Sequence, residues 1–367
     1  MNYLIVSSIT PTLRSGTGLR TYGVTAALAR HGAVELAYVV FGGSAPAPQY
    51  AQLSAVKTRP LVASRGFRRG IEFLRALSRE VPVGLARGIS PALAGALEGV
   101  PADVRAIADG PVAAAALLPY TGRREIVYLA HNLESSRLAG RLERGAHERF
   151  ERRAFGAFAE CWMATRADER GARALAGDRI ATRYVPNVID VTRITPVSPT
   201  GARRLLFVGD FSYGPNVEGL GFLCGEVLPE LWRTMPDIHL TAVGAGLPDT
   251  PRDRRIETPG FIEDLTSAYA AADVAVVPLL HGAGSPLKFV EGLAHGLPVV
   301  TTPHAAALLE DGVPGRDFVV GDGATGLAAA IAALLGDPAR AGKVGRAGRA
   351  LAERYYSVDH LAMLLGS

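Results

Sequence analysis

The sequence predicts an α/β protein with two domains, each built on a parallel β-sheet. Short apolar runs of strand length alternate with longer segments of helical periodicity along the whole chain. Residues 191–203, which include Pro196, Pro199 and Gly201, have neither periodicity and predict a linker between two similar halves. With 367 residues, the chain is long enough for two domains that each bury a core. Strands that alternate with helices are typical of parallel sheets covered on both faces.

The order of the apolar runs gives the elements of each half. In the first half, strands are predicted at residues 3–9, 34–41, 104–108, 126–130, 161–165 and 182–185. In the second half, they are predicted at 204–208, 239–243, 255–258, 274–277, 299–301 and 318–320. The main helices are predicted at 19–30, 216–231, 265–271, 286–295, 325–335, 339–355 and 359–365. We therefore expect domains at 1–195 and 196–350, followed by a closing helical segment at 351–367.

Composition excludes several classes of protein. The apolar content of 48% and the charged content of 20% are those of an ordinary globular protein. Cys161 and Cys224 are the only cysteines, so neither a disulfide framework nor a cysteine zinc site is expected. The first residues predict a strand rather than a basic leader, and the apolar runs are too short to span a bilayer. We therefore expect a cytoplasmic protein.

Positive charge is concentrated in the first half of the chain. Up to residue 195 there are 26 Lys and Arg against 16 Asp and Glu, although the net charge of the whole chain is only +4. Arginines alternate with apolar residues at helical spacing in 67–79 and again between Arg137 and Arg153. Such helices dock on an anionic membrane, hold an anionic acceptor or simply face solvent, and all three interpretations remain open. Nucleic acid is not an expected partner, because no aromatic–basic interleaving or known binding module occurs.

The segment 278–302 carries the strongest functional signal. A predicted strand leads into a glycine loop at 282–285, after which Pro286 begins a helix that Gly296 ends. Unpaired N–H groups and the helix dipole make such a helix start a site for anions. Open α/β sheets bind ligands at the carboxyl ends of their strands, where this loop lies.

Lys288 and Glu291 lie in the first turns of that helix, three residues apart and on one face. The simplest interpretation of such a pair is a solvated ion pair. Beside the glycine loop, however, the cation favours phosphate and the carboxylate can accept hydrogen bonds from sugar hydroxyls. The pair therefore favours a nucleotide-sugar diphosphate as ligand.

Two features of the first half point to the same kind of site. The loop at 11–18, before the first predicted helix, contains Gly16, Thr17 and Gly18, and Arg20 follows at the helix start. Its spacing is not that of a Gly-x-Gly-x-x-Gly dinucleotide fingerprint, and a plain turn is the alternative. His131 directly follows the strand 126–130, although a lone histidine is as often structural. The histidines lack metal-ligand spacing and no Asp-x-Asp pair occurs, so neither a metal nor a cofactor is expected.

Taken together, these motifs resemble those of the family 4 glycosyltransferases. The signature G-x-x-x-K-x-x-E-x-x-A-x-G-x-P-V-V is matched by Gly284, Lys288, Glu291, Ala294, Gly296, Pro298, Val299 and Val300. The likeness extends over nearly the whole chain, through the segments 15–18, 131–134, 185–187, 207–209 and 260–262. Each segment alone is weak, but their order and spacing together are specific.

The resemblance implies a GT-B fold, in which two Rossmann-like domains face each other across a cleft and a C-terminal helix crosses back to the first domain. It implies a retaining, metal-independent transfer of sugar from a UDP-, GDP- or dTDP-linked donor to a glycan, a lipid-linked or a small-molecule acceptor. The first domain would bind the acceptor and the second the donor. The implied catalytic residues are His131 and Lys288. The implied donor contacts are Gly16, Thr17, Gly18, Arg20, Gly209, Phe261, Ile262, Leu265, Gly284, Ser285, Pro286, Leu287, Lys288 and Glu291. In similar proteins the turn at 261–265 holds the nucleotide base, and a hydrophobic anchor at a helix start is an equally good interpretation of this turn.

The sequence departs from the family pattern at two places. Many members carry a pair of glutamates with seven residues between them; Glu291 matches the second, but Ala283 stands in place of the first. Many members also carry an Arg and a Lys in the stretch that corresponds to 209–216, which has neither here. The positive charge that stabilises the phosphates is therefore expected to come from Lys288, the helix start and Arg20. The departures also keep other functions open: a catalytically silent partner of another transferase, or a nucleotide-sugar epimerase or phosphorylase on the same fold.

Overall fold

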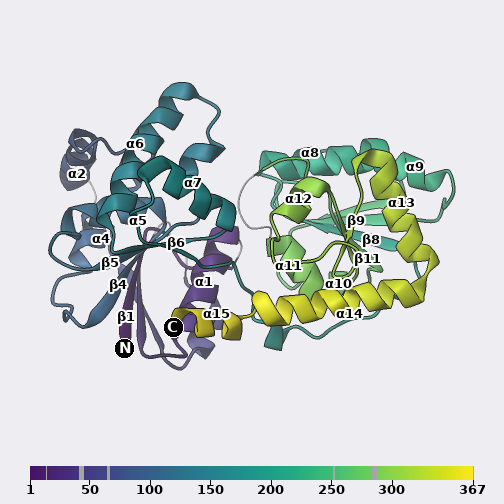
Figure 1. Cartoon of the computed structure of the whole chain (residues 1–367), viewed down its shortest axis with the longest axis horizontal. Helices are drawn as coiled ribbons and strands as arrows, with labels where there is room; N and C mark the ends of the chain where they lie inside the picture. Colours follow the sequence, from purple (N-terminus) through teal and green to yellow (C-terminus); the bar gives the residue numbers. More distant parts are fainter. Residues whose placement is uncertain (14, 41–44, 64–66, 251–252, 283–286, 367) are drawn as a thin grey trace. The chain divides into compact units, whose positions relative to one another are not determined.

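The chain folds into two compact units. The computed structural model describes residues 1–13, 15–40, 45–63, 67–250, 253–282 and 287–366. The first unit comprises Met1–Val188 with Leu361–Ser367, and the second comprises Ile189–His360 (Figure 1). The sequence-based boundary at residue 195 compares with a division after Val188, and the closing segment joins the first unit from Leu361 onward.

The first unit contains a seven-stranded parallel sheet in the order β3-β2-β1-β4-β5-β6-β7. Its strands are β1 (Asn2–Ser7), β2 (Val34–Val39), β3 (Val56–Leu61), β4 (Val104–Asp109), β5 (Ile126–Leu129), β6 (Glu160–Met163) and β7 (Thr182–Tyr184). Its helices are α1 (Gly16–Leu28), α2 (Phe67–Ser78), α3 (Val83–Gly88), α4 (Pro91–Gly95), α5 (Gly110–Leu117), α6 (Arg141–Ala157) and α7 (Arg166–Ala176), joined by most of α15 (Val358–Gly366). Figure 1 shows helices on both faces of this sheet.

The strands form because their residues are apolar on both faces and are covered by helices on each side. In β1, every residue from Tyr3 to Ser7 is buried, and all four residues of β5 are buried. The edge strand β3 was not predicted. It contains Lys57, Arg59 and Pro60, and only Leu61 is buried. Charged side chains and proline are tolerated at a sheet edge, where one row of N–H groups needs no partner strand.

The second unit repeats this architecture with a six-stranded parallel sheet in the order β10-β9-β8-β11-β12-β13. Its strands are β8 (Arg204–Val208), β9 (His239–Val243), β10 (Ile256–Gly260), β11 (Val274–Val277), β12 (Val299–Thr301) and β13 (Val319–Val320). Its helices are α8 (Gly214–Phe222), α9 (Leu228–Trp232), α10 (Thr266–Ala270), α11 (Leu287–Ala294), α12 (Pro303–Ala307), α13 (Gly323–Gly336) and α14 (Pro338–Tyr355). The helix predicted at 216–231 is divided by a π-helical turn at Leu223–Val227, just before Pro229, which has no N–H to donate.

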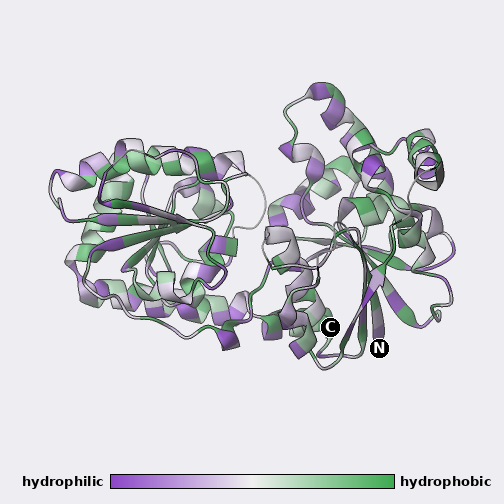
Figure 2. Ribbon diagram, turned by 180° about the vertical axis from the view of Figure 1, so that it is seen from behind, coloured by the Kyte–Doolittle hydropathy of each residue, from purple (hydrophilic) through white to green (hydrophobic). Residues whose placement is uncertain are grey.

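Two apolar clusters cover the two faces of the second sheet. Leu205 and Phe207 of β8 belong to one cluster and Leu206 to the other, as expected when successive side chains point to opposite faces. Figure 2 shows the apolar residues concentrated on the strands of this unit and the polar ones on the outer surfaces of its helices. Both sheets therefore have rigid, buried centres that can position polar groups at their edges.

The strand orders determine where ligands bind in such folds. In each sheet the order reverses direction once, between β1 and β4 in the first unit and between β8 and β11 in the second. Open parallel sheets bind ligands outside the carboxyl ends of the strands at this switch point. Asp109 is the last residue of β4, and Gly209 directly follows β8. These two positions therefore mark where each unit is expected to carry its site.

The segment predicted as a linker is held against the second unit. Ile189 donates a backbone hydrogen bond to Tyr356, and Arg349 of α14 donates to the carbonyls of Val191 and Ile194. Further along, α15 belongs to the first unit, where Ala362 accepts from His31 at 2.7 Å. The chain therefore passes from the first unit to the second after Val188 and returns through the last helix.

Candidate functional site

In the second unit, Lys288 lies at the start of α11, close to the carboxyl end of β8. Its ammonium donates to the side-chain oxygen of Asn216 in α8 and lies 5.4 Å from the centre of the Phe207 ring. Burial lowers the pKa of Lys288 to about 7, and the charge of Asp210 opposes this effect only in part. The structure thus confines a cation at the predicted place, with an uncharged amide as its hydrogen-bond partner.

The amide of Asn216 is fixed by contacts on both of its sides. Its nitrogen donates to the backbone carbonyl of Asp210 at 2.6 Å, while its oxygen accepts from Lys288. A side chain with one donor end and one acceptor end satisfies both groups, which a carboxylate could not do. Gly209 makes room for this arrangement, because a Cβ there would lie 3.2 Å from the Asn216 amide nitrogen.

Gly244 permits a close approach of two strand ends. A Cβ on Gly244, which has a φ of +155°, would lie 1.6 Å from the Gly209 carbonyl oxygen. The loops after β8 and β9 therefore run side by side with no side chain between them. The predicted contact of Gly209 with a donor stays a prediction.

Glu291 lies one turn after Lys288 and has a separate environment. The hydroxyl of Tyr269 donates to Glu291 Oε2 at 3.3 Å, and the Tyr269 ring stacks on His295 with 4.0 Å between ring centres. Burial raises the pKa of Glu291 to about 7, against the opposing hydrogen bond from Tyr269. Burial likewise lowers the pKa of His295 to about 4, so the stacked ring is neutral at pH 7. The sequence predicted Glu291 but gave no indication of the tyrosine that orients it.

The turn predicted to hold the nucleotide base follows β10. Phe261 is 49% exposed, whereas Ile262 and Leu265 pack against the apolar cluster that contains Tyr269 and Phe289. The alternative prediction, a hydrophobic anchor before a helix, fits Ile262 and Leu265, which lie just before α10. A role for this turn in base binding stays a prediction.

The glycine loop of the predicted signature is only partly described. Ala283, Gly284, Ser285 and Pro286 lie outside the described residues. On either side of them, the Gly282 carbonyl accepts from His304 Nε2 at 3.0 Å, and Leu287 is buried. The described flanks therefore fix where this loop begins and ends.

In the first unit, His131 pairs with a carboxylate that the sequence did not single out. His131 Nε2 lies 2.8 Å from Asp109 Oδ1, and both side chains are almost completely buried. Since a carboxylate only accepts, Nε2 carries the proton, and in the neutral ring Nδ1 is then the acceptor. A His–Asp pair of this kind fixes the orientation and the tautomer of the imidazole.

Asp109 is held ionised although it is fully buried. Burial raises its pKa, but the charge of His131 and hydrogen bonds from His131, Ser7 and Thr21 outweigh this, so the pKa lies below its usual value. Thr21 of α1 donates to it at 2.9 Å. Gly110 follows with a φ of +81°, and a Cβ there would lie 2.9 Å from the His131 ring. Glycine is therefore required at 110 both for its conformation and for space.

Arg20 is placed differently from the prediction. Only 2% of the residue is exposed, and its guanidinium donates to the backbone carbonyls of Ala130, Trp162 and Val185 and to the side-chain oxygen of Asn187. Burial lowers its pKa to about 10, so it remains charged at neutral pH. The predicted phosphate contact is therefore wrong for Arg20. The arginine instead ties together the ends of β5, β6 and β7, directly behind His131.

The loop around Gly16, Thr17 and Gly18 starts α1. Ser15 caps the helix by accepting from the Gly18 N–H at 3.1 Å, and the Thr21 hydroxyl oxygen lies 3.1 Å from the Thr17 carbonyl oxygen. A Cβ on Gly18 would lie 1.9 Å from the Thr12 carbonyl oxygen, so this glycine lets the loop close on itself. Gly16 is exposed, as a donor contact would require, and that contact stays a prediction.

Two acidic side chains hold the loop that follows His131. Asp168 accepts from the N–H of Leu133 at 3.2 Å, and Glu151 of α6 accepts from the N–H of Glu134 at 2.6 Å. Burial raises the pKa of Glu151 to about 7. These bonds satisfy backbone donors that a loop would otherwise expose, so His131 lies between two fixed segments.

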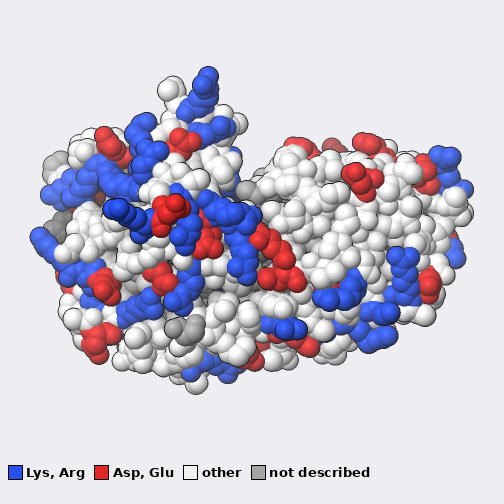
Figure 3. All heavy atoms as spheres, in the orientation of Figure 1, with Lys and Arg blue, Asp and Glu red and all other residues white. Residues whose placement is uncertain are grey.

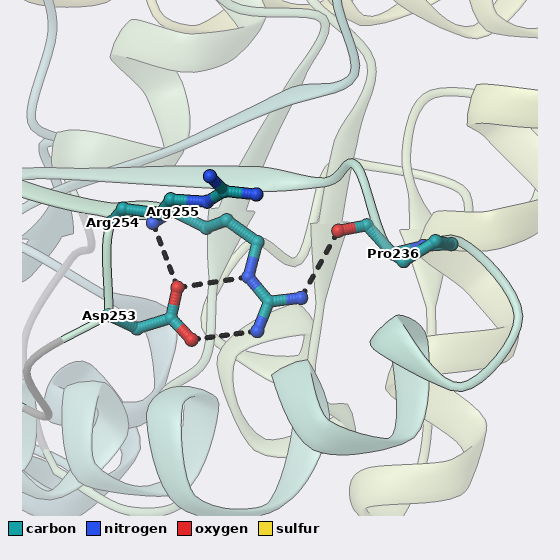
Figure 4. Close-up of a pocket in the computed structure, with 4 residues that line it drawn as sticks. All are labelled: Pro236, Asp253, Arg254 and Arg255. Atoms are coloured by element: carbon teal, nitrogen blue, oxygen red, sulfur yellow. Dashed lines mark hydrogen bonds and ion pairs between the residues drawn. The ribbon is translucent and has the colours of Figure 1, made fainter.

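A hollow of about 470 Å³ in the second unit does not coincide with these residues. Pro236, Asp253, Arg254 and Arg255 line it, and Arg255 forms two hydrogen bonds with the Asp253 carboxylate (Figure 4). It lies before β9 and β10, at the amino ends of the strands, whereas the predicted site lies at their carboxyl ends. Within the part of the chain that the structure describes, no cluster of His, Cys, Asp and Glu side chains suits a metal ion.

The structure thus brings the predicted residues together in two groups. Lys288, Glu291 and Gly209 lie at the switch point of the second sheet, and His131 lies at that of the first. Sequence reasoning missed Asp109, Asn216 and Tyr269. Asp109 carried a weak signal, since it ends an apolar run just before a Gly-Pro pair, but the partners of Asn216 and Tyr269 are distant in sequence.

Comparison with known proteins relates the second unit to a described family. Residues 202–337 match the family model described as "Glycosyl transferases group 1". The chain is 30% identical over 216 residues to the glycogen synthase of Mycobacterium tuberculosis. This alignment covers 52% of this chain and 51% of that protein. The chain therefore spans about half the length of the curated relatives that it matches.

Solved structures extend the likeness of fold to the whole chain. HepE of Anabaena, in complex with UDP and glucose, superposes with a TM-score of 0.74 at 14% identity, covering 100% of this chain and 98% of that one. Sucrose-phosphate synthase of Thermosynechococcus elongatus gives the same TM-score at 18% identity, with the same coverage. Trehalose-6-phosphate synthase gives 0.68 at 13% identity, covering 99% of this chain and 98% of that one. Residues 202–337 thus match the model of the glycosyl transferases group 1 family, and the whole chain has a GT-B fold of two Rossmann-like domains.

Proposed function

We propose that this protein is a retaining glycosyltransferase of the family 4 type, which moves a sugar from a nucleotide-sugar to a hydroxyl of an acceptor without a metal ion. The observation that carries the proposal is the buried pair of Lys288 and Asn216 at the switch point of the second sheet, with Glu291 one turn further along α11. The family match falls on the same unit, and HepE was solved with UDP and with UDP-glucose. The donor would be UDP-, GDP- or dTDP-linked, and the acceptor a glycan, a lipid-linked or a small molecule.

In this proposal each residue has a separate task. Lys288, together with the start of α11, stabilises the negative charge that develops on the departing diphosphate. Glu291, oriented by Tyr269, accepts hydrogen bonds from the ribose. His131, oriented by Asp109, contacts the transferred sugar or the reacting centre. The departing phosphate itself takes the proton of the acceptor hydroxyl, since no residue is nominated as a covalent nucleophile.

Asp109→Asn tests the orientation of His131. The amide keeps the size of the side chain but removes the charge that fixes the histidine tautomer, so we expect kcat to fall by at least about tenfold with little change in the donor KM. Steady-state kinetics against donor concentration give the two constants separately. Asp103→Asn, at an exposed position before the same strand, should leave both unchanged. An unaltered kcat in Asp109→Asn would remove His131 and Asp109 from the mechanism.

The donor proposal is tested by thermal-shift titration with UDP-, GDP- and dTDP-sugars. A ligand that binds only the native state stabilises it by RT ln(1 + [L]/Kd), about 2.7 kcal/mol at a hundred times Kd. We expect one nucleotide class to raise Tm, and the same donor to be hydrolysed slowly in the absence of acceptor. A protein that neither binds nor hydrolyses any donor would be the silent partner. Epimerisation of the donor without acceptor, or a need for inorganic phosphate, would instead indicate the other two activities.

The first unit, which is proposed to bind the acceptor, has a basic surface that could also contact an anionic membrane. Figure 3 shows Lys and Arg side chains gathered on this unit, including the free end of α6. On that helix Arg141, Arg144, Arg149 and Arg153 are exposed, and Leu142 is 92% exposed. None of the helices in the described part of the chain has the length and hydropathy that a bilayer span requires. From the exposed arginines and Leu142 we further propose that the protein is a cytoplasmic enzyme that binds anionic membranes peripherally.

Vesicle co-sedimentation tests this contact. The double change Arg141→Glu with Leu142→Glu should weaken binding to phosphatidylserine-containing vesicles by about tenfold, because each basic residue near an anionic surface contributes about 1 kcal/mol. Arg346→Glu, on an exposed face of α14 in the second unit, is the control and should bind as wild type does. Equal sedimentation of all three proteins, or none, would leave the arginines of α6 as an ordinary solvated surface.

A further inference from the structure

The hydrogen-bond partner that Lys288 has in the structure is unusual for a buried cation. Buried lysines are generally paired with carboxylates, because removing a charge from water is costly. Lys288 instead donates to the neutral amide of Asn216 and lies against the Phe207 ring. The amide satisfies one N–H of the ammonium but supplies no opposite charge.

Among the described residues, the surrounding charges do not replace a carboxylate partner. From the loop after β8, the charge of Asp210 reaches Lys288, but Asp210 is exposed and accepts from Ser212 at 2.7 Å. On α8, Glu218 is paired with His281 at 2.5 Å. On α11 itself, Glu291 accepts from Tyr269. Each of these carboxylates therefore has another partner, and the lysine retains a site for one more anion.

The position of Asn216 is itself tightly determined. The residue is 4% exposed, its amide nitrogen is held by the Asp210 carbonyl, and Gly209 packs against it. An aspartate of the same shape would neutralise the lysine but would also place an acceptor against that carbonyl. The amide thus orients the ammonium without neutralising it.

We propose that Asn216 is a positioning residue that holds the Lys288 amine without neutralising it, so that Lys288 takes up a proton when a diphosphate binds. This inference rests on the proposed function and deepens it. Because burial lowers the pKa of Lys288 to about 7, about half of the lysines are uncharged in the free protein at pH 7. A bound diphosphate favours the charged form, so binding and protonation are linked. The proton comes from solvent, and no covalent bond changes.

Isothermal titration calorimetry with UDP at pH 7, in buffers of low and high ionisation enthalpy, measures this uptake. We expect wild type to take up about half a proton more than Lys288→Arg, whose guanidinium stays charged and which also corrects for protons lost by UDP itself. Asn216→Asp should lose the uptake, because its carboxylate keeps the lysine charged, and should bind UDP at least about tenfold more weakly. Ala339→Asp adds the same charge at an exposed position of α14 and should behave as wild type.

The outcomes separate this inference from the proposed function. Wild type that binds UDP with the same proton count as Lys288→Arg would overturn the inference while the donor site stands. Asn216→Asp that binds UDP as tightly as wild type, with the same uptake, would overturn the role of Asn216. Circular dichroism verifies that each variant is folded, and Lys288→Arg tests the proton step even if Asn216→Asp is unstable. Should wild type bind none of UDP, GDP and dTDP, the proposed function would fail, and this inference with it.

Discussion

Replacing Arg20 by methionine should lower the free energy of unfolding of the first unit by about 3–5 kcal/mol. The arginine is almost completely buried and donates to three backbone carbonyls and to Asn187. Methionine fills much of the space but leaves four buried acceptors without their donor. It also removes a positive charge near Asp109 and Asp168, whose fields act on the guanidinium.

The two tryptophans allow this measurement to be made on one unit within the full chain. Trp162 lies in β6 of the first unit, and Trp232 ends α9 of the second. In a Trp232→Phe background, the fluorescence of Trp162 during urea unfolding reports the first unit alone. Arg123→Met, an exposed position in that unit, should change the free energy by less than about 0.5 kcal/mol. A loss below about 1 kcal/mol in Arg20→Met would contradict the structural role that we assign to Arg20.

Replacing Lys288 by alanine should lower turnover at least about tenfold, equivalent to about 1.4 kcal/mol of barrier. The lysine is the cation that the described residues place at the switch point of the second sheet, and charge stabilisation at the departing diphosphate depends on it. Lys288→Arg keeps the charge and should recover part of the activity. Lys343→Ala, at an exposed position on α14, should turn over as wild type does.

Removing the charge of Lys288 should raise the stability of the folded protein. The pKa of Lys288 is lowered on folding, so the unfolded state binds the proton more tightly and the folded state is penalised at every pH below the unfolded value. At pH 7 that penalty is largely present, and Lys288→Met should therefore raise Tm while it lowers activity. Variants of Lys288 that lost stability but kept wild-type turnover would exclude both the burial argument and the proposed catalytic role.

Much of the fold could be predicted because buried parallel strands are continuous apolar runs. The predictions for β8, β9, β11 and β12 coincide with the observed strands, and those for β1 and β5 differ only at their ends. The exceptions have local causes. The edge strand β3 carries lysine, arginine and proline, which conceal it from an apolar pattern. The predicted strand ended at Ala108, so Asp109, the polar residue that ends β4, was not predicted as part of the site.

The candidate site was predicted only in part, because its partners are distant along the chain. Lys288 and Glu291 could be found from their spacing beside a glycine loop. Asn216 lies 72 residues before Lys288, and Tyr269 lies 22 residues before Glu291. Arg20 was expected to face the ligand because it follows a glycine loop. The sequence contains no signal for the three strand ends that surround its guanidinium.

Periodicity and turn chemistry, which act between neighbouring residues, are enough to predict the two α/β units and most of their strands and helices. They also predict the lysine and the glutamate near one sheet switch point. Three features depend instead on how the folded chain packs: the burial of Arg20, the hydrogen bond between Asp109 and His131, and that between Asn216 and Lys288. Such contacts join strand ends that the parallel sheet brings to one edge, and burial then sets the charge of each group.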